Sequence, residues 1–147
     1  MTARTRMKIA GMALSAAVTL SVCGCGGDAG AAIPQEDGVY TGVSSADDKG
    51  AYGEVRITVE NGAITACSFV TWQKDGSVKD EEYGKVNGEI SNQEFYDKAQ
   101  LAVRAMQQYS DAMVAQQSSA KVDAVTGATI AHGQFLEAVA DALDGER

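Results

Sequence analysis

Two strand-forming segments joined by the dipeptide Asn61-Gly62 are the strongest constraint on the fold of this chain. The first segment, "EVRITVE", alternates polar and apolar residues, and its apolar residues are Val55, Ile57 and Val59. Asn-Gly favours a two-residue type I′ turn, so the segments should pair as an antiparallel hairpin. The second segment, "AITACSFVTW", is apolar on both faces. We therefore expect it to be the central strand of a small sheet.

A third strand and two helices are expected around this hairpin. The segment "DGVYTGVSS" comes before it and is strand-forming at Val39, Thr41 and Val43. After it, from Asn92 to about Gln117, a helix is predicted with Ser91 or Asn92 as the N-cap and Glu94 in the first turn. The apolar residues of this helix, spaced alternately by four and three, are Phe95, Ala99, Ala102, Met106, Tyr109 and Met113.

A last helix, ending at Gly145, has one apolar face made of Phe135, Ala138, Val139, Ala142 and Leu143. Strands followed by helices indicate an α+β fold. The expected architecture is a small antiparallel sheet with the long helix and the C-terminal helix packed on one face.

The amino terminus has the pattern of an export signal with a lipidation site. A basic start is followed by an apolar run at residues 9–22, which is short for a membrane span. The sequence "LSVCGCGG" then matches a lipobox. We expect Cys25 to carry the lipid because small Gly24 precedes it, with Cys23 as the alternative. The predicted organisation is a signal peptide at 1–24, a flexible tether at 25–36 and one folded domain at 37–147.

Charge and cysteine content exclude several functions. The formal net charge of −8 argues against nucleic-acid binding, which needs clustered basic residues. Of the three cysteines, only Cys67 would remain unlipidated after cleavage before Cys25, so no internal disulfide is expected. Cys67 lies in an apolar run and is expected to be a small buried residue. The sequence contains no legible metal cluster, nucleophile–base pair or G-x-G-x-x-G motif.

The stretch "DAVTGATIAHGQF", which begins at Asp123, comes directly before the last predicted helix. A threonine N-cap, at Thr126 or Thr129, with Gly127 in a turn would explain part of it. Capping does not explain why Asp123 stands three residues before Thr126. It also does not explain why the two residues before Thr129, Gly127 and Ala128, are so small that the backbone there is accessible. The N–H groups and positive dipole end of a helix start would suit a phosphate.

At these residues the chain resembles a known family. "DAVTGAT" fits the D-x-x-[ST]-G-A-[ST] pattern at which ApbE-type flavin transferases attach FMN through its phosphate, which would place the bond on Thr129. The motif occurs in FMN-binding domains of the Rnf complex G subunit, of the C subunit of the sodium-pumping NADH:quinone reductase, and of many exported lipoproteins. Ile130-Ala131 is a departure, because many relatives have another Ser or Thr there.

The resemblance extends over nearly the whole predicted domain. "DGVYTG", "GEVRITVENGAITACSFV", "EFYDKAQLAVRAM" and "VDAVTGATIAHGQFLEAVADAL" resemble successive blocks of FMN-binding domain lipoproteins. They are most similar to Gram-positive, pheromone-precursor-type lipoproteins implicated in extracellular electron transfer. The resemblance implies a lipid-anchored, extracytoplasmic electron carrier without catalytic residues of its own.

The resemblance also implies partners and residue roles. The partners would be an ApbE-type flavin transferase, a quinol-linked electron donor and the membrane itself. Thr129 would carry FMN covalently; Asp123 and Thr126 would serve recognition by the transferase, and Gly127 and Ala128 would give it access.

The sequence gives less information about which residues would contact the flavin ring. Trp72, Tyr83 and Tyr40 are candidates, although each could be ordinary core or surface. The single histidine, His132, could contact phosphate or ring, but an exposed helical position is expected. The alternative function is a non-enzymatic surface lipoprotein that holds FMN non-covalently or not at all. A flavin reductase is disfavoured because no nicotinamide motif is present.

Overall fold

The computed structural model describes Ile33 and residues 36–144. The predicted signal peptide, both candidate lipidated cysteines, nearly all of the tether and Gly145 lie outside the described residues.

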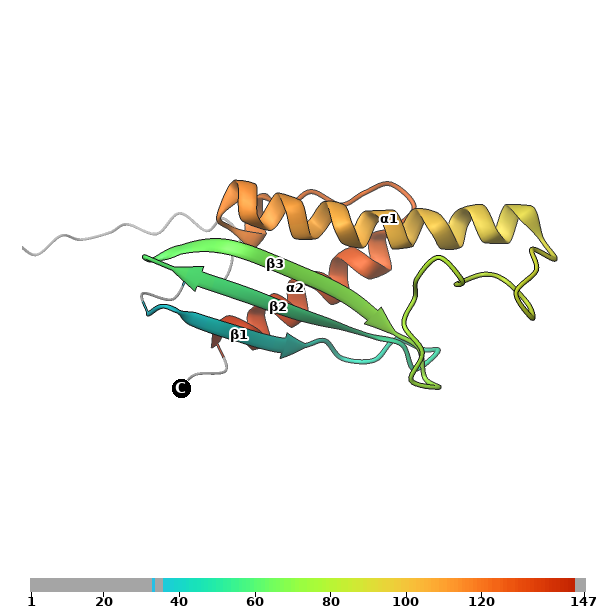
Figure 1. Ribbon diagram of the computed structural model, residues 1–147, viewed down its shortest axis with the longest axis horizontal. Coiled ribbons are helices and arrows are strands. Elements are labelled where there is room, and N and C mark those ends of the chain that lie inside the picture. Colours follow the sequence, from blue (N-terminus) through green and yellow to red (C-terminus); the bar gives the residue numbers. More distant parts are fainter. Residues whose placement is uncertain (1–32, 34–35, 145–147) are drawn as a thin grey trace, which may run out of the picture.

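Three antiparallel strands form one sheet in the order β1-β2-β3 (Figure 1). They are β1 (Gly38–Val43), β2 (Tyr52–Glu60) and β3 (Ala63–Trp72). The predicted hairpin is confirmed, because β2 pairs with β3 and both turn residues have positive φ, 54° at Asn61 and 72° at Gly62.

The prediction of a central position for "AITACSFVTW" is wrong. This segment is β3 at one edge of the sheet, and β2 is the central strand. Several residues that made β3 look apolar or neutral on both faces, such as Ala63, Ala66 and Ser68, are small and exposed to solvent. Only Ile64, Phe69 and Thr71 of β3 are buried, and the register of β2 and β3 shifts between Ile64 and the other two.

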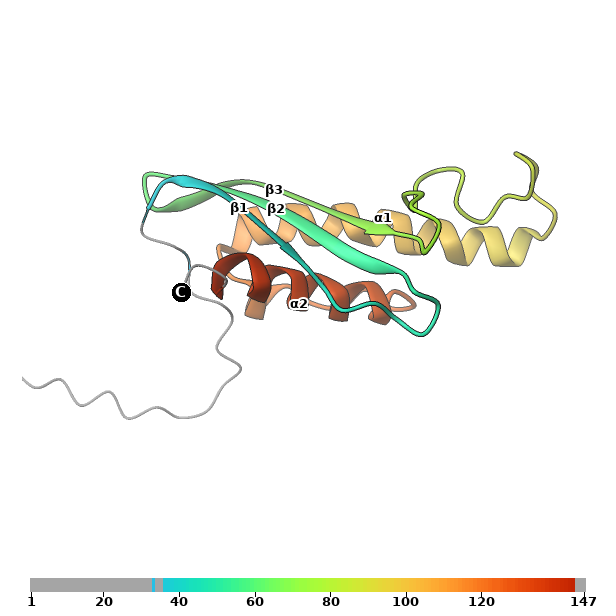
Figure 2. The ribbon, with the colours of Figure 1, turned by 90° about the horizontal axis from the view of Figure 1, so that it is seen from below.

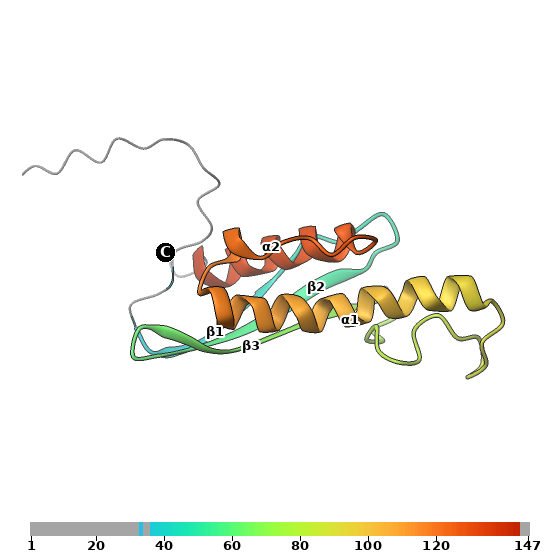
Figure 3. The ribbon, with the colours of Figure 1, turned by 90° about the horizontal axis from the view of Figure 1, so that it is seen from above.

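Both long helices cover the same face of the sheet, as Figure 2 shows from below. Helix α1 (Gln93–Gln116) packs on β3, a single 3-10 turn η1 (Ser119–Lys121) follows, and α2 (Thr129–Asp144) packs on β1 and β2. Figure 3 shows α1 and α2 running beside each other over the sheet. The α+β prediction is therefore confirmed, with the long helix and the C-terminal helix on one face.

The core lies between the sheet and the two helices. Its largest fully buried side chains are Tyr109, Phe135, Ile57, Met113, Val55, Val59, Val139 and Thr71. Met106 is also buried, with 5% of its surface exposed. Both predicted helical faces are therefore confirmed in their central turns.

The first turns of α1 differ from the prediction. Asn92 is the N-cap, as expected, and its side-chain oxygen accepts a hydrogen bond from the Phe95 N–H at 3.0 Å. Phe95 itself is 51% exposed, because the amino-terminal half of α1 extends past the sheet beside the loop of residues 73–92 (Figure 1). An apolar face of a helix thus predicts burial only where another element covers that face.

Cys67 is half-buried and packs against the core rather than lying fully within it. No helix among the described residues is long and apolar enough to span a membrane.

Candidate cofactor site

A tight turn over residues 125–128 comes before α2. The Ala128 N–H donates to the Val125 carbonyl oxygen at 2.9 Å, and Gly127 has a φ of +85°. A positive φ at the third residue of a turn favours glycine. A Cβ at Gly127 would also lie 2.8 Å from Leu101 Cδ2 of α1. Glycine is therefore favoured here chiefly for its conformation, and a larger residue would also require the end of the Leu101 side chain to move.

The buried hydroxyl of Tyr109 holds both ends of this turn. It accepts a hydrogen bond from the Val125 N–H at 3.0 Å and donates to the Ala128 carbonyl oxygen at 3.2 Å. The same carbonyl accepts the first helical bond of α2 from the His132 N–H. The start of α2 is therefore fixed from inside the core.

His132 is half-buried, so the prediction of an exposed histidine is wrong. Its Nε2 lies 2.7 Å from the Val122 carbonyl oxygen, which requires the proton on Nε2. Its ring also packs against Tyr109, with 5.3 Å between ring centroids. His132 therefore helps to hold the connector in place and does not line the cavity described below.

Neither threonine of the motif caps the helix. The first helical residue is Thr129, so the N-cap position belongs to Ala128, which has no side-chain acceptor. Thr126 and Thr129 are both exposed, and neither hydroxyl forms a hydrogen bond with a described residue. No acidic side chain lies in the first turn of α2 to offset the positive end of its dipole.

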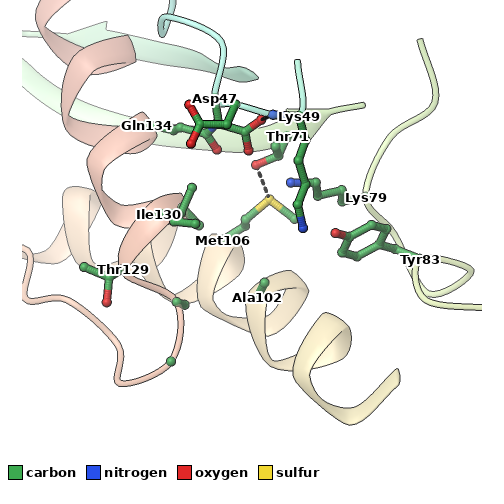
Figure 4. A pocket seen from close by; sticks show the side chains of 14 residues that line it. Asp47, Lys49, Thr71, Lys79, Tyr83, Ala102, Met106, Thr129, Ile130 and Gln134 are labelled. Carbon is green, nitrogen blue, oxygen red and sulfur yellow. Dashed lines mark hydrogen bonds between the residues drawn. The ribbon is translucent and has the colours of Figure 1, made fainter. Parts of the chain in front are cut away.

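Thr129 lies at a cavity of about 460 Å³, a size typical of small-molecule sites. The cavity is formed by the β1–β2 loop, the end of β3, the loop after β3, the middle of α1 and the start of α2 (Figure 4). Its lining residues are Asp47, Asp48, Lys49, Thr71, Lys79, Tyr83, Ala102, Met106, Gly127, Ala128, Thr129, Ile130, Ala131 and Gln134.

Apolar side chains form the middle of this cavity. Figure 4 shows Ile130 and Met106 between Thr129 on one side and Tyr83 on the other. Met106 is held by Thr71, whose hydroxyl donates to its sulfur at 3.0 Å. Ile130 is 68% exposed, so its side chain is open to contact by a ligand. A flat apolar ring would cover this surface.

Charged and polar groups form the wall away from Thr129. Asp47 accepts hydrogen bonds from the backbone N–H groups of Lys49 and Ala51, both at 2.9 Å, which shapes the β1–β2 loop. The Lys79 ammonium lies 5.3 Å from the ring centroid of Tyr83. Burial lowers the pKa of Lys79, and nearby Asp47 offsets this only in part. The wall thus places charges of both signs, from Asp47, Asp48, Lys49 and Lys79, next to the apolar part of the cavity.

Gln134 supplies a buried acceptor without a donor. Only 6% of this residue is exposed, and its Nε2 donates to the Ala51 carbonyl oxygen at 2.8 Å. That bond fixes the amide orientation and leaves Oε1 buried without a partner in the described structure. Buried polar atoms are nearly always paired, so this part of the cavity wall suits a ligand that brings an N–H donor.

The structure brings together only some of the residues selected from the sequence. Thr129, Gly127, Ala128 and Tyr83 line the cavity. Asp123 and Thr126 are exposed and outside its lining.

Two of the three aromatic residues that were candidates for contact with the flavin ring, Trp72 and Tyr40, do not line the cavity. Trp72 donates from Nε1 to Glu54 at 2.7 Å on the sheet face away from the helices, and Tyr40 belongs to the core. Sequence reasoning missed Lys49, Lys79 and Gln134. The two lysines lie in polar loops without a pattern, and Gln134 looks like an ordinary polar residue of α2.

Comparison with known proteins identifies the class of domain. Residues 49–144 match the FMN-binding domain family, and the chain therefore belongs to that family. FMN is accordingly its cofactor. The observations above fit this group: an apolar bed for a ring, an orphaned acceptor at Gln134, and a helix start for a phosphate.

One solved structure has a similar fold, and a second gives a weaker match. The crystal structure of a Clostridium perfringens protein is 24% identical, with a TM-score of 0.60, and the match covers 76% of this chain and 88% of that one. A solution structure from Clostridium thermocellum is 22% identical, with a TM-score of 0.47, covering 76% and 93% of the two chains. No curated protein matches the sequence significantly.

Proposed function

We propose that this protein is an exported electron carrier, anchored by lipid on Cys25 (or on Cys23), with FMN joined to Thr129 by a phosphoester bond. The observation that carries the proposal is the position of Thr129. Its side chain is exposed, its hydroxyl has no hydrogen-bond partner among the described residues, and it borders the cavity with the apolar bed. An exposed and uncommitted hydroxyl is open to a modifying enzyme, and a phosphate bonded to it would lie at the border of the cavity.

The residues around Thr129 support attachment at this position. Gly127 and Ala128 place no bulky side chain beside the hydroxyl. The first backbone N–H groups of α2 have no intrahelical acceptor and would face a phosphate at the helix start. Exposed Asp123, which has no hydrogen bond to a described residue, would be read by an ApbE-type transferase.

Bound FMN would supply reversible electron transfer through its ring. In the proposed site, Ile130 and Met106 would contact the ring and exclude water from one face. Gln134 would accept a hydrogen bond from a ring N–H. The electrons would come from a quinol-linked donor at the membrane, and we assign no catalytic step to the protein itself.

Intact-mass analysis tests the proposal and separates it from the alternative of loosely held FMN. The protein is produced with and without an ApbE-type transferase, then denatured and weighed. The proposal predicts an FMN adduct only with the transferase, and a yellow colour that stays with the denatured protein after desalting. Colour that separates from the denatured protein on desalting, with no adduct, would favour non-covalent binding by the same fold.

A further inference from the structure

Lys79 is a half-buried cation without a salt bridge at the cavity wall away from Thr129. It lies in the loop after β3, and its backbone N–H donates to the Thr71 carbonyl oxygen at 2.8 Å, which fixes this part of the loop to β3. No salt bridge to Lys79 occurs among the described residues. A partly buried charge usually has a partner, so its ammonium group is available to an anion.

Lys79 lies among charges of both signs, and the nearby Asp47 acts on it more strongly than Lys49 does. Lys49 lies close enough to lower the pKa of Lys79, and Asp47, the one acidic group that acts on it, forms no salt bridge with it. The ring of Tyr83 lies against the ammonium, at 5.3 Å from the ring centroid. The ring prevents water from surrounding the Lys79 ammonium completely. The position of Lys79 is therefore better defined than that of Lys49, which is exposed.

Figure 4 shows Lys79 and Thr129 on opposite sides of Met106 and Ile130. A cofactor whose phosphate is bonded to Thr129 would place its ring over these apolar residues. The polar edge of the ring would then face the wall away from Thr129, where Lys79 and Gln134 lie together with Asp47, Asp48 and Lys49. This inference rests on the proposed site for FMN.

We propose that Lys79 neutralises the negative charge that the flavin ring gains on reduction, and thereby raises its midpoint potential. A ring that takes up two electrons from a quinol-type donor and one proton from water, at N5, gains one negative charge. That charge is spread over N1 and the C2 carbonyl oxygen, while Lys79 keeps its protons. An adjacent ammonium stabilises the reduced ring more than the neutral oxidised ring.

The test uses the full-length protein produced with an ApbE-type transferase, in wild-type form and as Lys79→Met, Lys79→Arg and Lys98→Met. Lys98 is exposed on α1 and paired with Glu94, so Lys98→Met changes the net charge equally but away from the cavity. Flavin content is first measured by intact mass. The midpoint potential is then titrated spectroelectrochemically at several pH values.

We expect Lys79→Met to keep the flavin and to lower its midpoint potential by at least about 30 mV. For a two-electron couple, this corresponds to a tenfold change in the equilibrium constant of reduction. The pKa of N1 in the reduced ring should rise in the same variant. Lys79→Arg and Lys98→Met should remain close to wild type. An unchanged potential in Lys79→Met, or an equal fall in Lys98→Met, would overturn the proposal.

The result also separates this inference from the proposed attachment. If wild type carries no covalent adduct, attachment at Thr129 fails, and the same titration is run on protein loaded with free FMN. A fall in midpoint potential that occurs only in Lys79→Met would then still support the proposed role of Lys79 in stabilising the reduced ring. Failure of the protein to bind FMN in either form would overturn both proposals.

Discussion

The hydroxyl of Tyr109 donates to the Ala128 carbonyl oxygen at 3.2 Å. Ala128 is the residue directly before Thr129, the proposed attachment site. Because the Tyr109 hydroxyl also accepts from the Val125 N–H, one side chain of α1 holds both ends of the motif turn. The position of Thr129 therefore depends on the core and not on the motif alone.

Replacing Tyr109 with Phe removes both of these hydrogen bonds. We expect the free energy of unfolding to fall by roughly 1–3 kcal/mol, because the part-buried Val125 N–H and the buried Ala128 carbonyl both lose their partner. Amide exchange at Val125 should become faster. Denaturant unfolding and hydrogen exchange measure the two effects, with Tyr52→Phe as a control whose hydroxyl bonds to no described residue. Equal stability of Tyr109→Phe and wild type would show that these bonds do not hold the turn.

Gly127→Ala should destabilise the turn. An alanine at φ +85° costs about 1–2 kcal/mol, and its Cβ would require Leu101 to move. Gly133 offers a matched control within α2, since a Cβ there meets nothing within 4 Å. Gly133→Ala should increase stability by about 0.5–1 kcal/mol. Thermal unfolding of the two variants checks this difference in sign, and destabilisation by both would contradict it.

Phe135→Ala should be among the most damaging core substitutions. Phe135 is fully buried and packs edge-to-face on Phe69, so its truncation should cost about 3–5 kcal/mol. Met106→Ala should cost about 2–5 kcal/mol and also remove part of the cavity floor. Urea unfolding midpoints measure both costs. Midpoints equal to wild type would contradict the assignment of the core.

Cys67 should react slowly with thiol reagents in the folded protein. Burial, with a smaller effect from Asp111, raises the pKa of its thiol to about 12, so almost no thiolate is present at neutral pH. Its alkylation by iodoacetamide should accelerate as pH rises toward that value, and at neutral pH after unfolding in urea. The assay uses protein with Cys23 and Cys25 replaced by Ser. Rapid alkylation of the folded form at pH 7 would contradict the burial of this thiol.

Local patterns predicted the elements of the fold well. Alternation in β2 and the Asn61-Gly62 turn depend on neighbouring residues only, and both are confirmed. The exposure of Phe95 and the edge position of β3 depend instead on which elements cover them, which periodicity does not report.

The candidate site was predicted only in part for the same reason. The motif is contiguous, so Thr129 and Gly127 were found in the sequence. The opposite wall is assembled from separate segments, with Lys49 before β2 and Lys79 after β3. The half-buried position of His132 results from its contacts with Val122 and Tyr109, which no local pattern of helix α2 could indicate.

The attachment of FMN to Thr129 is the central claim, and peptide mass mapping tests it most directly. Protein made with an ApbE-type transferase is digested, and the FMN-bearing peptide is fragmented to locate the adduct. Thr129→Ala should remove all covalent flavin at nearly unchanged stability, since this hydroxyl has no partner among the described residues. Thr126→Ala should lower the yield without abolishing it, and Asp123→Ala should lower it strongly. We predict the adduct on Thr129 alone; an adduct on Thr126, or none despite an active transferase, would contradict the account.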